Sequence, residues 1–219
     1  MSAVESGAGE WTERQRDVLD AALRLIVEGR PLTMTSLASA ASCSKETIYK
    51  WFGDRAGLLT ATVRHQASRV RGTPLPEGRA TRDALEASLH RFAVEWLTVL
   101  GGQTSVALNR LAVAHAGTDR AADLGAIVLN NGPLAMEARL VPMLEAGRLA
   151  GILDFDAGDA ETAARSFFGL VVRDVQIRLL LGDPLSLSPA EIERDAGRAT
   201  RQFFTLFAGG QHRSTGGDS

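Results

Sequence analysis

The 219-residue sequence contains one cysteine, Cys43, so it cannot form a disulfide within the chain. A chain without disulfides fits a reducing compartment, and we expect a cytoplasmic protein. No apolar run is long enough to cross a bilayer, and the first ten residues have neither the positive nor the apolar region of a secretion signal. We therefore expect no membrane partner. Cys43 itself is interpreted as a small packed residue, with a redox switch as the alternative.

The sequence also lacks the motifs of common enzyme classes. It has no Gly-x-Ser-x-Gly, no His-Glu-x-x-His and no phosphate-binding loop, and its four histidines are scattered. Residues 154–159 resemble a calcium loop, but the glycine comes one place early and Arg165 occupies the twelfth position, where glutamate is required. Capping of the next helix explains these acidic residues. We therefore expect no catalytic residues, no cofactor and no metal site.

Positive charge is concentrated in one segment. Residues 45–71 hold six basic and two acidic side chains, a local charge of +4. Because the formal net charge of the whole chain is −2, the remaining residues together carry −6. This asymmetry indicates an anionic partner at one end only. It argues against a nonspecific nucleoid protein, which would be basic along its whole length.

Residues 33–52 predict two short helices around a polar turn. The first helix has a small apolar face formed by Leu37, Ala38 and Ala41, and Thr33 can cap it. The second follows a cap at Ser44, and its apolar residues recur at helical spacing as Ile48, Trp51 and Phe52. Its opposite face is polar and cationic and consists of Lys45, Glu46, Tyr49 and Lys50. Such a face suits the major groove of DNA, so the segment is interpreted as a helix-turn-helix.

Residues 18–59 resemble the N-terminal DNA-binding domain of TetR-family transcriptional regulators. The most specific part is Thr47-Ile48-Tyr49-x-x-Phe52, followed by a short turn, a basic residue and paired leucines. Two features depart from the family pattern. The link over residues 28–32 is short, and Ser42-Cys43 stand in the turn where glycine and valine are commoner.

The resemblance implies roles for individual residues. Thr47, Tyr49 and Arg55 match positions that contact phosphate, while Lys45 and Glu46 match positions that reach base edges. Trp51 is left open, because the family pattern places it near the groove and its spacing points it inward. The complete predicted DNA-binding set is Thr33, Thr35, Ser44, Lys45, Glu46, Thr47, Tyr49, Lys50, Trp51 and Arg55.

Helical periodicity predicts an all-α fold, with a helix-turn-helix DNA-binding domain followed by a helical ligand-binding and dimerisation bundle. We expect a disordered tail over 1–10, a first domain over 11–71, a second over 79–208 and a tail over 209–219, because residues 72–78 contain two prolines and two glycines. The predicted helices span about 12–28, the two of the helix-turn-helix, 54–70, 81–100, 105–115, 119–131, 134–149, 160–181 and 189–208.

The predicted helix over 160–181 is apolar on almost all sides, which indicates burial against a partner chain. The last helix offers a complementary face, and two such helices from each chain would form a four-helix interface. TetR-family proteins dimerise in this manner, and residues 167–182 also resemble the C-terminal domain of the AefR-like subgroup. The predicted dimer residues are Phe167, Phe168, Val171, Val175, Leu179, Ala199, Phe203 and Leu206.

By the same resemblance, the C-terminal half is a ligand-sensing domain. The candidate ligand residues are Phe92, Trp96, Asn109, His115, Met136, Phe168 and Arg173, and ordinary core packing is the alternative for the apolar ones. Arg173 and Asp174 could instead form an ion pair across the dimer.

The sequence thus predicts a homodimeric transcriptional regulator. We expect a repressor that binds a palindromic double-stranded operator and leaves it when an unknown small-molecule inducer binds. A transcriptional activator of the same fold is the alternative, and a helical enzyme is disfavoured. We expect the helix over 54–70 to act as the lever that transmits ligand binding in the C-terminal domain to the DNA-binding domain.

Overall fold

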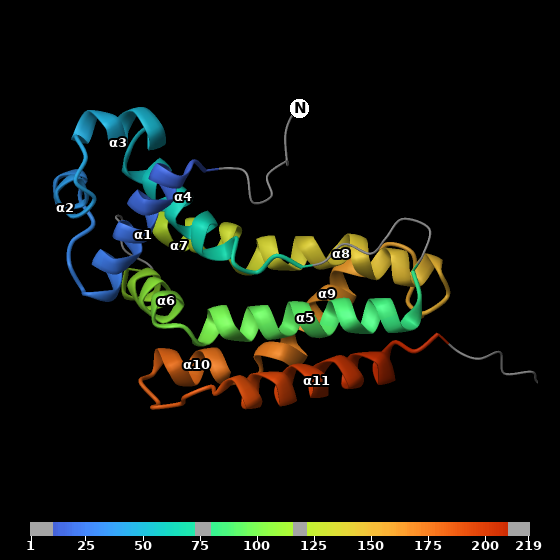
Figure 1. Cartoon of the computed structure of the whole chain (residues 1–219). Coiled ribbons are helices and arrows are strands. Elements are labelled where there is room, and N and C mark those ends of the chain that lie inside the picture. The colour runs from blue at the N-terminus through green and yellow to red at the C-terminus, as the bar shows by residue number, and fades with distance from the viewer. Residues whose placement is uncertain (1–10, 73–79, 116–121, 210–219) are drawn as a thin grey trace, which may run out of the picture. The chain divides into compact units, whose positions relative to one another are not determined.

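The computed structural model describes residues 11–72, 80–115 and 122–209 (Figure 1). Within this part the chain is helical without a β-strand, and Leu153 and Ala208 form an isolated bridge. The helices are α1 (Glu13–Val27), α2 (Met34–Ala40), α3 (Lys45–Phe52), α4 (Arg55–Ala67), α5 (Arg82–Gly101), α6 (Gln103–His115), α7 (Ala122–Asn131), α8 (Pro133–Leu149), α9 (Ala160–Val172), α10 (Val175–Leu180) and α11 (Pro189–Leu206). The predicted all-α fold is confirmed.

The predicted tail over 1–10, the predicted tail over 209–219 except for its first residue, and most of the predicted domain boundary lie outside the described residues. Among the described helices, none combines the length and the apolar character needed to span a membrane.

Helix α1 lies within the predicted span of about 12–28 and begins with a capping box. Thr12 Oγ1 accepts from the N–H of Gln15 (3.3 Å), and the Gln15 side chain accepts from the N–H of Thr12 (2.8 Å), which satisfies two otherwise unpaired donors. The buried face then repeats at helical spacing and comprises Val18, Leu19, Ala21, Ala22, Leu23, Leu25 and Ile26.

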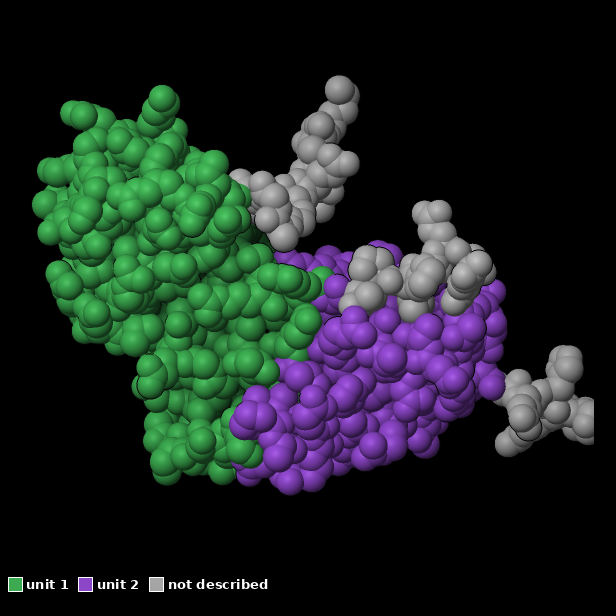
Figure 2. Space-filling model, in the orientation of Figure 1, with its two compact units in different colours: residues 1–71, 95–136, 174–188 green, residues 72–94, 137–173, 189–219 purple. Residues whose placement is uncertain are grey.

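The chain divides into two compact units, shown in green and purple in Figure 2. The first comprises residues 1–71, 95–136 and 174–188, and the second comprises 72–94, 137–173 and 189–219. In the first unit, the apolar core of α1–α4 continues into α6 through Leu108 and Ala112 and into α7 through Leu124 and Val128. The helix-turn-helix therefore does not build its core alone. It shares one with α6 and α7.

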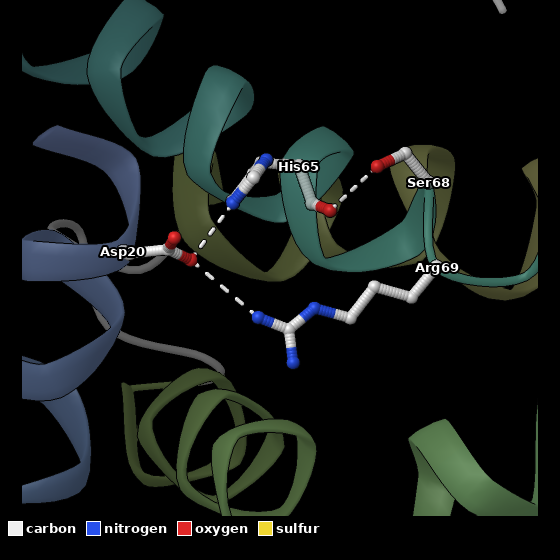
Figure 3. A network of polar contacts seen from close by, with 4 residues as sticks. All are labelled: Asp20, His65, Ser68 and Arg69. Carbon is white, nitrogen blue, oxygen red and sulfur yellow. Dashed lines mark hydrogen bonds and ion pairs between the residues drawn. The ribbon is translucent and has the colours of Figure 1, made fainter. Parts of the chain in front are cut away.

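A polar network joins α1 to the C-terminal end of α4 (Figure 3). Asp20 Oδ1 lies 2.9 Å from His65 Nε2 and 3.4 Å from an Arg69 guanidinium nitrogen, and Ser68 Oγ donates to the His65 carbonyl (2.8 Å). His65 is buried, whereas the Asp20 side chain is 42% exposed. The network satisfies a buried imidazole at the point where α4 packs on α1.

We expect Asp20→Ala to lower the free energy of unfolding by about 1 kcal/mol, because it removes the partner of a buried imidazole but acts at a half-exposed carboxylate. Asp20→Asn keeps an oxygen acceptor for His65, so it is expected to lower the free energy of unfolding by less than Asp20→Ala does. Urea denaturation measures both variants. An Asp20→Ala protein as stable as the wild type would show that the network contributes nothing.

The predicted single helix over 160–181 is wrong, because the structure breaks it into α9 and α10. Arg173, the C-cap of α9, takes a left-handed φ of +45°, and its N–H donates to the Gly169 carbonyl (3.0 Å). The two pieces bury different faces: α9 packs on α11 in the second unit, and α10 packs on α6 in the first. Each helix buries one face, and the segment appears apolar on all sides only when the two are treated as one continuous helix.

The predicted dimer residues lie mostly in the core of a single chain. Phe167 and Phe203 are fully buried, with ring centroids 5.2 Å apart in an edge-to-face arrangement. The other buried members of the predicted set are Val171, Val175, Leu179 and Ala199. The prediction assumed one helix that needs a partner chain, but its halves are covered by α11 and α6. Leu206, 65% exposed, and half-buried Phe168 are the members of the set that a second chain could reach.

Candidate nucleic-acid interface

Helices α2 and α3 are each started by a side-chain cap at the predicted residue. Thr33 Oγ1 accepts from the N–H of Ser36 (3.0 Å), and Ser36 Oγ accepts from the N–H of Thr33 (3.0 Å). Ser44 Oγ accepts from the N–H of Thr47 (3.1 Å) and lies 3.0 Å from the Thr47 hydroxyl. Thr33, Ser44 and Thr47 thus have structural roles in the caps.

The inward face of α3 anchors the helix in the apolar core. Ile48 is fully buried and Phe52 is 7% exposed. Trp51 is half-buried, packs against this core and meets the Phe52 ring edge-on with centroids 6.2 Å apart. The position of Trp51 agrees with the inward direction that its spacing indicated.

The outward face of α3 is polar and exposed to solvent. It carries Lys45, Glu46, Tyr49 and Lys50, and the Tyr49 side chain is 52% exposed. None of these four side chains forms a hydrogen bond or an ion pair with another described residue. Their donors and acceptors are therefore available to an external partner.

Arg55 is the first residue of α4, exposed, and its side chain is unpaired within the described part of the chain. A cation at the N-terminal end of a helix opposes the helix dipole. Helix stability therefore gives no reason for an arginine here, whereas a phosphate partner would. Thr35 lies exposed on α2, so the predicted set gathers on α2, α3 and the start of α4.

Sequence reasoning missed Arg14 of α1. A guanidinium nitrogen of Arg14 donates to the backbone carbonyls of Ala41 (2.8 Å) and Ser42 (3.0 Å), in the turn between α2 and α3. Arg14 precedes Ala41 by 27 positions and Ser42 by 28 positions. No local pattern could reveal contacts at such separations, because spacing rules describe only one helix at a time.

The predicted ligand residues fall in both units. Trp96, Asn109 and Met136 belong to the first, and Phe92, Phe168 and Arg173 belong to the second, while the His115 side chain lies outside the described atoms. Phe92, Trp96 and Met136 are buried at 0%, 5% and 3% exposure, as ordinary core residues are.

Two polar members of this set are engaged by neighbours. The Asn109 amide donates to the Ser105 carbonyl (2.8 Å) and accepts from the Gln176 amide (3.3 Å), in a space too tight for a water molecule. Arg173 pairs with Asp195 of α11, and Asp174 pairs with Arg178 (3.7 Å). Arg173 and Asp174 therefore each have a partner within one chain, and the pair across a dimer stays a prediction.

Comparisons with known proteins agree on one family. Residues 87–208 match the family described as "AefR-like transcriptional repressor, C-terminal domain". A TetR transcriptional regulator from Agrobacterium tumefaciens is 42% identical, with a TM-score of 0.76 over 91% of this chain and 96% of that one. The Flavonoid-responsive Regulator FrrA is 26% identical, with a TM-score of 0.64 over 89% of this chain and 97% of that one.

Among curated proteins, the HTH-type transcriptional repressor LfrR of Mycolicibacterium smegmatis is 28% identical over 89 residues, which are 41% of this chain and 46% of that protein. The chain thus spans less than half the length of the curated relatives that it matches.

Proposed function

Since the chain belongs to the TetR family of transcriptional regulators, we propose that it is a cytoplasmic homodimeric repressor that binds a palindromic operator through α3. The observation that carries the proposal is the unpaired polar face of α3, held outward by the buried Ile48 and Phe52. Two such faces on a symmetric dimer would enter successive major grooves about 34 to 36 Å apart.

Residue roles follow from side-chain chemistry. Lys45 can donate to guanine O6 or N7, and Glu46 can accept from cytosine N4, so these two would read bases. Tyr49, Lys50 and Arg55 would contact phosphates, which position the protein without specifying sequence. The names of the relatives support repression over activation.

We further propose that a small molecule releases the operator. This part is supported by the name of the Flavonoid-responsive Regulator FrrA, whose structure this chain resembles.

The division of roles predicts two different mutant phenotypes. Arg55→Ala should weaken binding to all duplexes and reduce the slope of log affinity against log salt by about one, since one phosphate contact is lost. Lys45→Ala should instead relax the preference at one base position by about 1–3 kcal/mol. Fluorescence anisotropy on duplexes selected from a random library measures both effects. An Arg55→Ala protein with wild-type affinity and slope would contradict the placement of α4 beside the DNA.

A reporter gene preceded by the selected duplex separates repression from activation. Expression of the wild-type protein should lower reporter output, and the Lys45→Ala protein should lower it less. Output that rises with the wild-type protein would assign activation to this chain and replace the repressor proposal.

A further inference from the structure

The turn between α2 and α3 is strained at one residue. The N–H of Cys43 donates to the Ala38 carbonyl (3.1 Å) and the N–H of Ser42 to the Ser39 carbonyl (3.4 Å), which are the two bonds of a Schellman motif. Ser42 occupies the position of that motif where glycine is usual, and its φ is +49°. Glycine adopts this left-handed conformation freely, whereas a residue with a Cβ atom adopts it at a cost.

The Schellman bonds use the carbonyls of Ala38 and Ser39 but leave those of Ala41 and Ser42 to another donor. Arg14 supplies it, since one of its guanidinium nitrogens lies 2.8 Å from the Ala41 oxygen and 3.0 Å from the Ser42 oxygen. The positive charge also lies at the C-terminal end of α2, where the helix dipole favours it. Arg14 therefore stabilises the strained turn from a different helix, α1.

This turn sets the direction of α3. Cys43 is the single residue between Ser42 and Ser44, the N-cap of α3, so the backbone angles at Ala41 and Ser42 determine how α3 leaves α2. A small rotation there would move the outward side chains of α3 together, away from their matching groups in a groove.

We propose that Arg14 is a positioning residue for DNA recognition, which holds the turn at Ser42 so that α3 presents its polar face in one orientation. The inference rests on the proposed function of α3 as the DNA-reading helix. The Arg14 side chain is 49% exposed, so the competing role is a direct phosphate contact, which predicts a different salt dependence.

Anisotropy titrations at several salt concentrations test the role, with the duplex that the wild-type protein selects from a random library. Arg14→Ala is expected to bind about tenfold more weakly, because loss of two hydrogen bonds from a charged donor lowers the fraction of molecules with a competent turn. Its salt slope should equal that of the wild type. Arg24→Ala removes the same charge from the exposed face of α1, where the Arg24 side chain has no partner among the described residues, and should bind within about twofold of the wild type.

A double variant identifies the turn as the route of the effect. With Ser42→Gly in place the left-handed conformation costs little, so Arg14→Ala combined with Ser42→Gly should recover most of the lost affinity. Arg14→Lys keeps the charge and one donor site, and is expected to bind with an intermediate affinity. Circular dichroism spectra that match the wild type confirm that each variant is folded.

Three results would each overturn the inference. The first is an Arg14→Ala protein that binds DNA with wild-type affinity. The second is a loss of affinity accompanied by a salt slope smaller by about one. The third is a loss of affinity that is equally large when Ser42→Gly is also present. A wild-type protein that selects no duplex would instead overturn the proposed function and the positioning role with it, a result distinct from any outcome for the variants.

Discussion

Phe203→Ala is expected to lower the free energy of unfolding by about 3–5 kcal/mol, a large share of the total stability of a typical domain. Phe203 is fully buried within one chain and contacts the rings of Phe167, Phe204 and Phe207, with a centroid separation of 4.7 Å to Phe207. Truncation would leave a cavity where α9 packs on α11. Urea denaturation followed by circular dichroism measures the loss.

Leu206→Ala is the matched control, three residues further along α11. Its side chain is 65% exposed in the single chain, so its removal should change the stability of the isolated chain by no more than about 0.5 kcal/mol. If Phe203 served a contact between chains, Phe203→Ala would give a folded monomer of nearly unchanged stability. That outcome, seen by light scattering, would contradict the assignment of Phe203 to the core of the chain.

A small molecule that releases the operator is expected to lower operator affinity about 5- to 150-fold, equivalent to 1–3 kcal/mol of coupling. The sequence predicts that α4, the helix after α3, links ligand binding to DNA binding. The structure adds a second route, because α1 packs on α6 and α4 packs on α7 within one continuous core. A shift of α6 or α7 would therefore change the orientation of α3 through apolar contacts.

Reciprocity gives this coupling a quantitative check. The operator must reduce the affinity for the inducer by the same factor as the inducer reduces the affinity for the operator. Calorimetric titration of an inducer, found by loss of anisotropy in a compound screen, is run with and without the selected duplex. Equal inducer affinities in the two titrations would show that ligand binding does not control DNA binding.

The helix-turn-helix could be predicted from sequence because its determinants are local. Thr33 and Ser44 each cap the helix that follows them, and Ile48 and Phe52 recur at helical spacing and are buried. Capping and periodicity depend on residues three or four apart, which a sequence displays directly. The exposed positions of Lys45 and Tyr49 follow from the same periodicity.

The features that sequence reasoning missed depend on long-range packing. Arg173 breaks the predicted helix over 160–181 with a left-handed φ, although arginine carries no preference for that conformation. With the break unseen, apolar residues that face α6 and α11 were assigned to a partner chain. The contact from Arg14 to the turn was missed for the same reason, since it joins two helices that only the folded chain brings together.

That α3 reads DNA sequence is tested most directly by one anisotropy experiment. The wild-type protein is titrated at fixed physiological salt against its selected duplex and against a scrambled duplex of equal length and base composition. The affinity for the selected duplex is expected to be higher by about a thousandfold or more, the usual range for specific over nonspecific binding. Equal affinities for the two duplexes would contradict it.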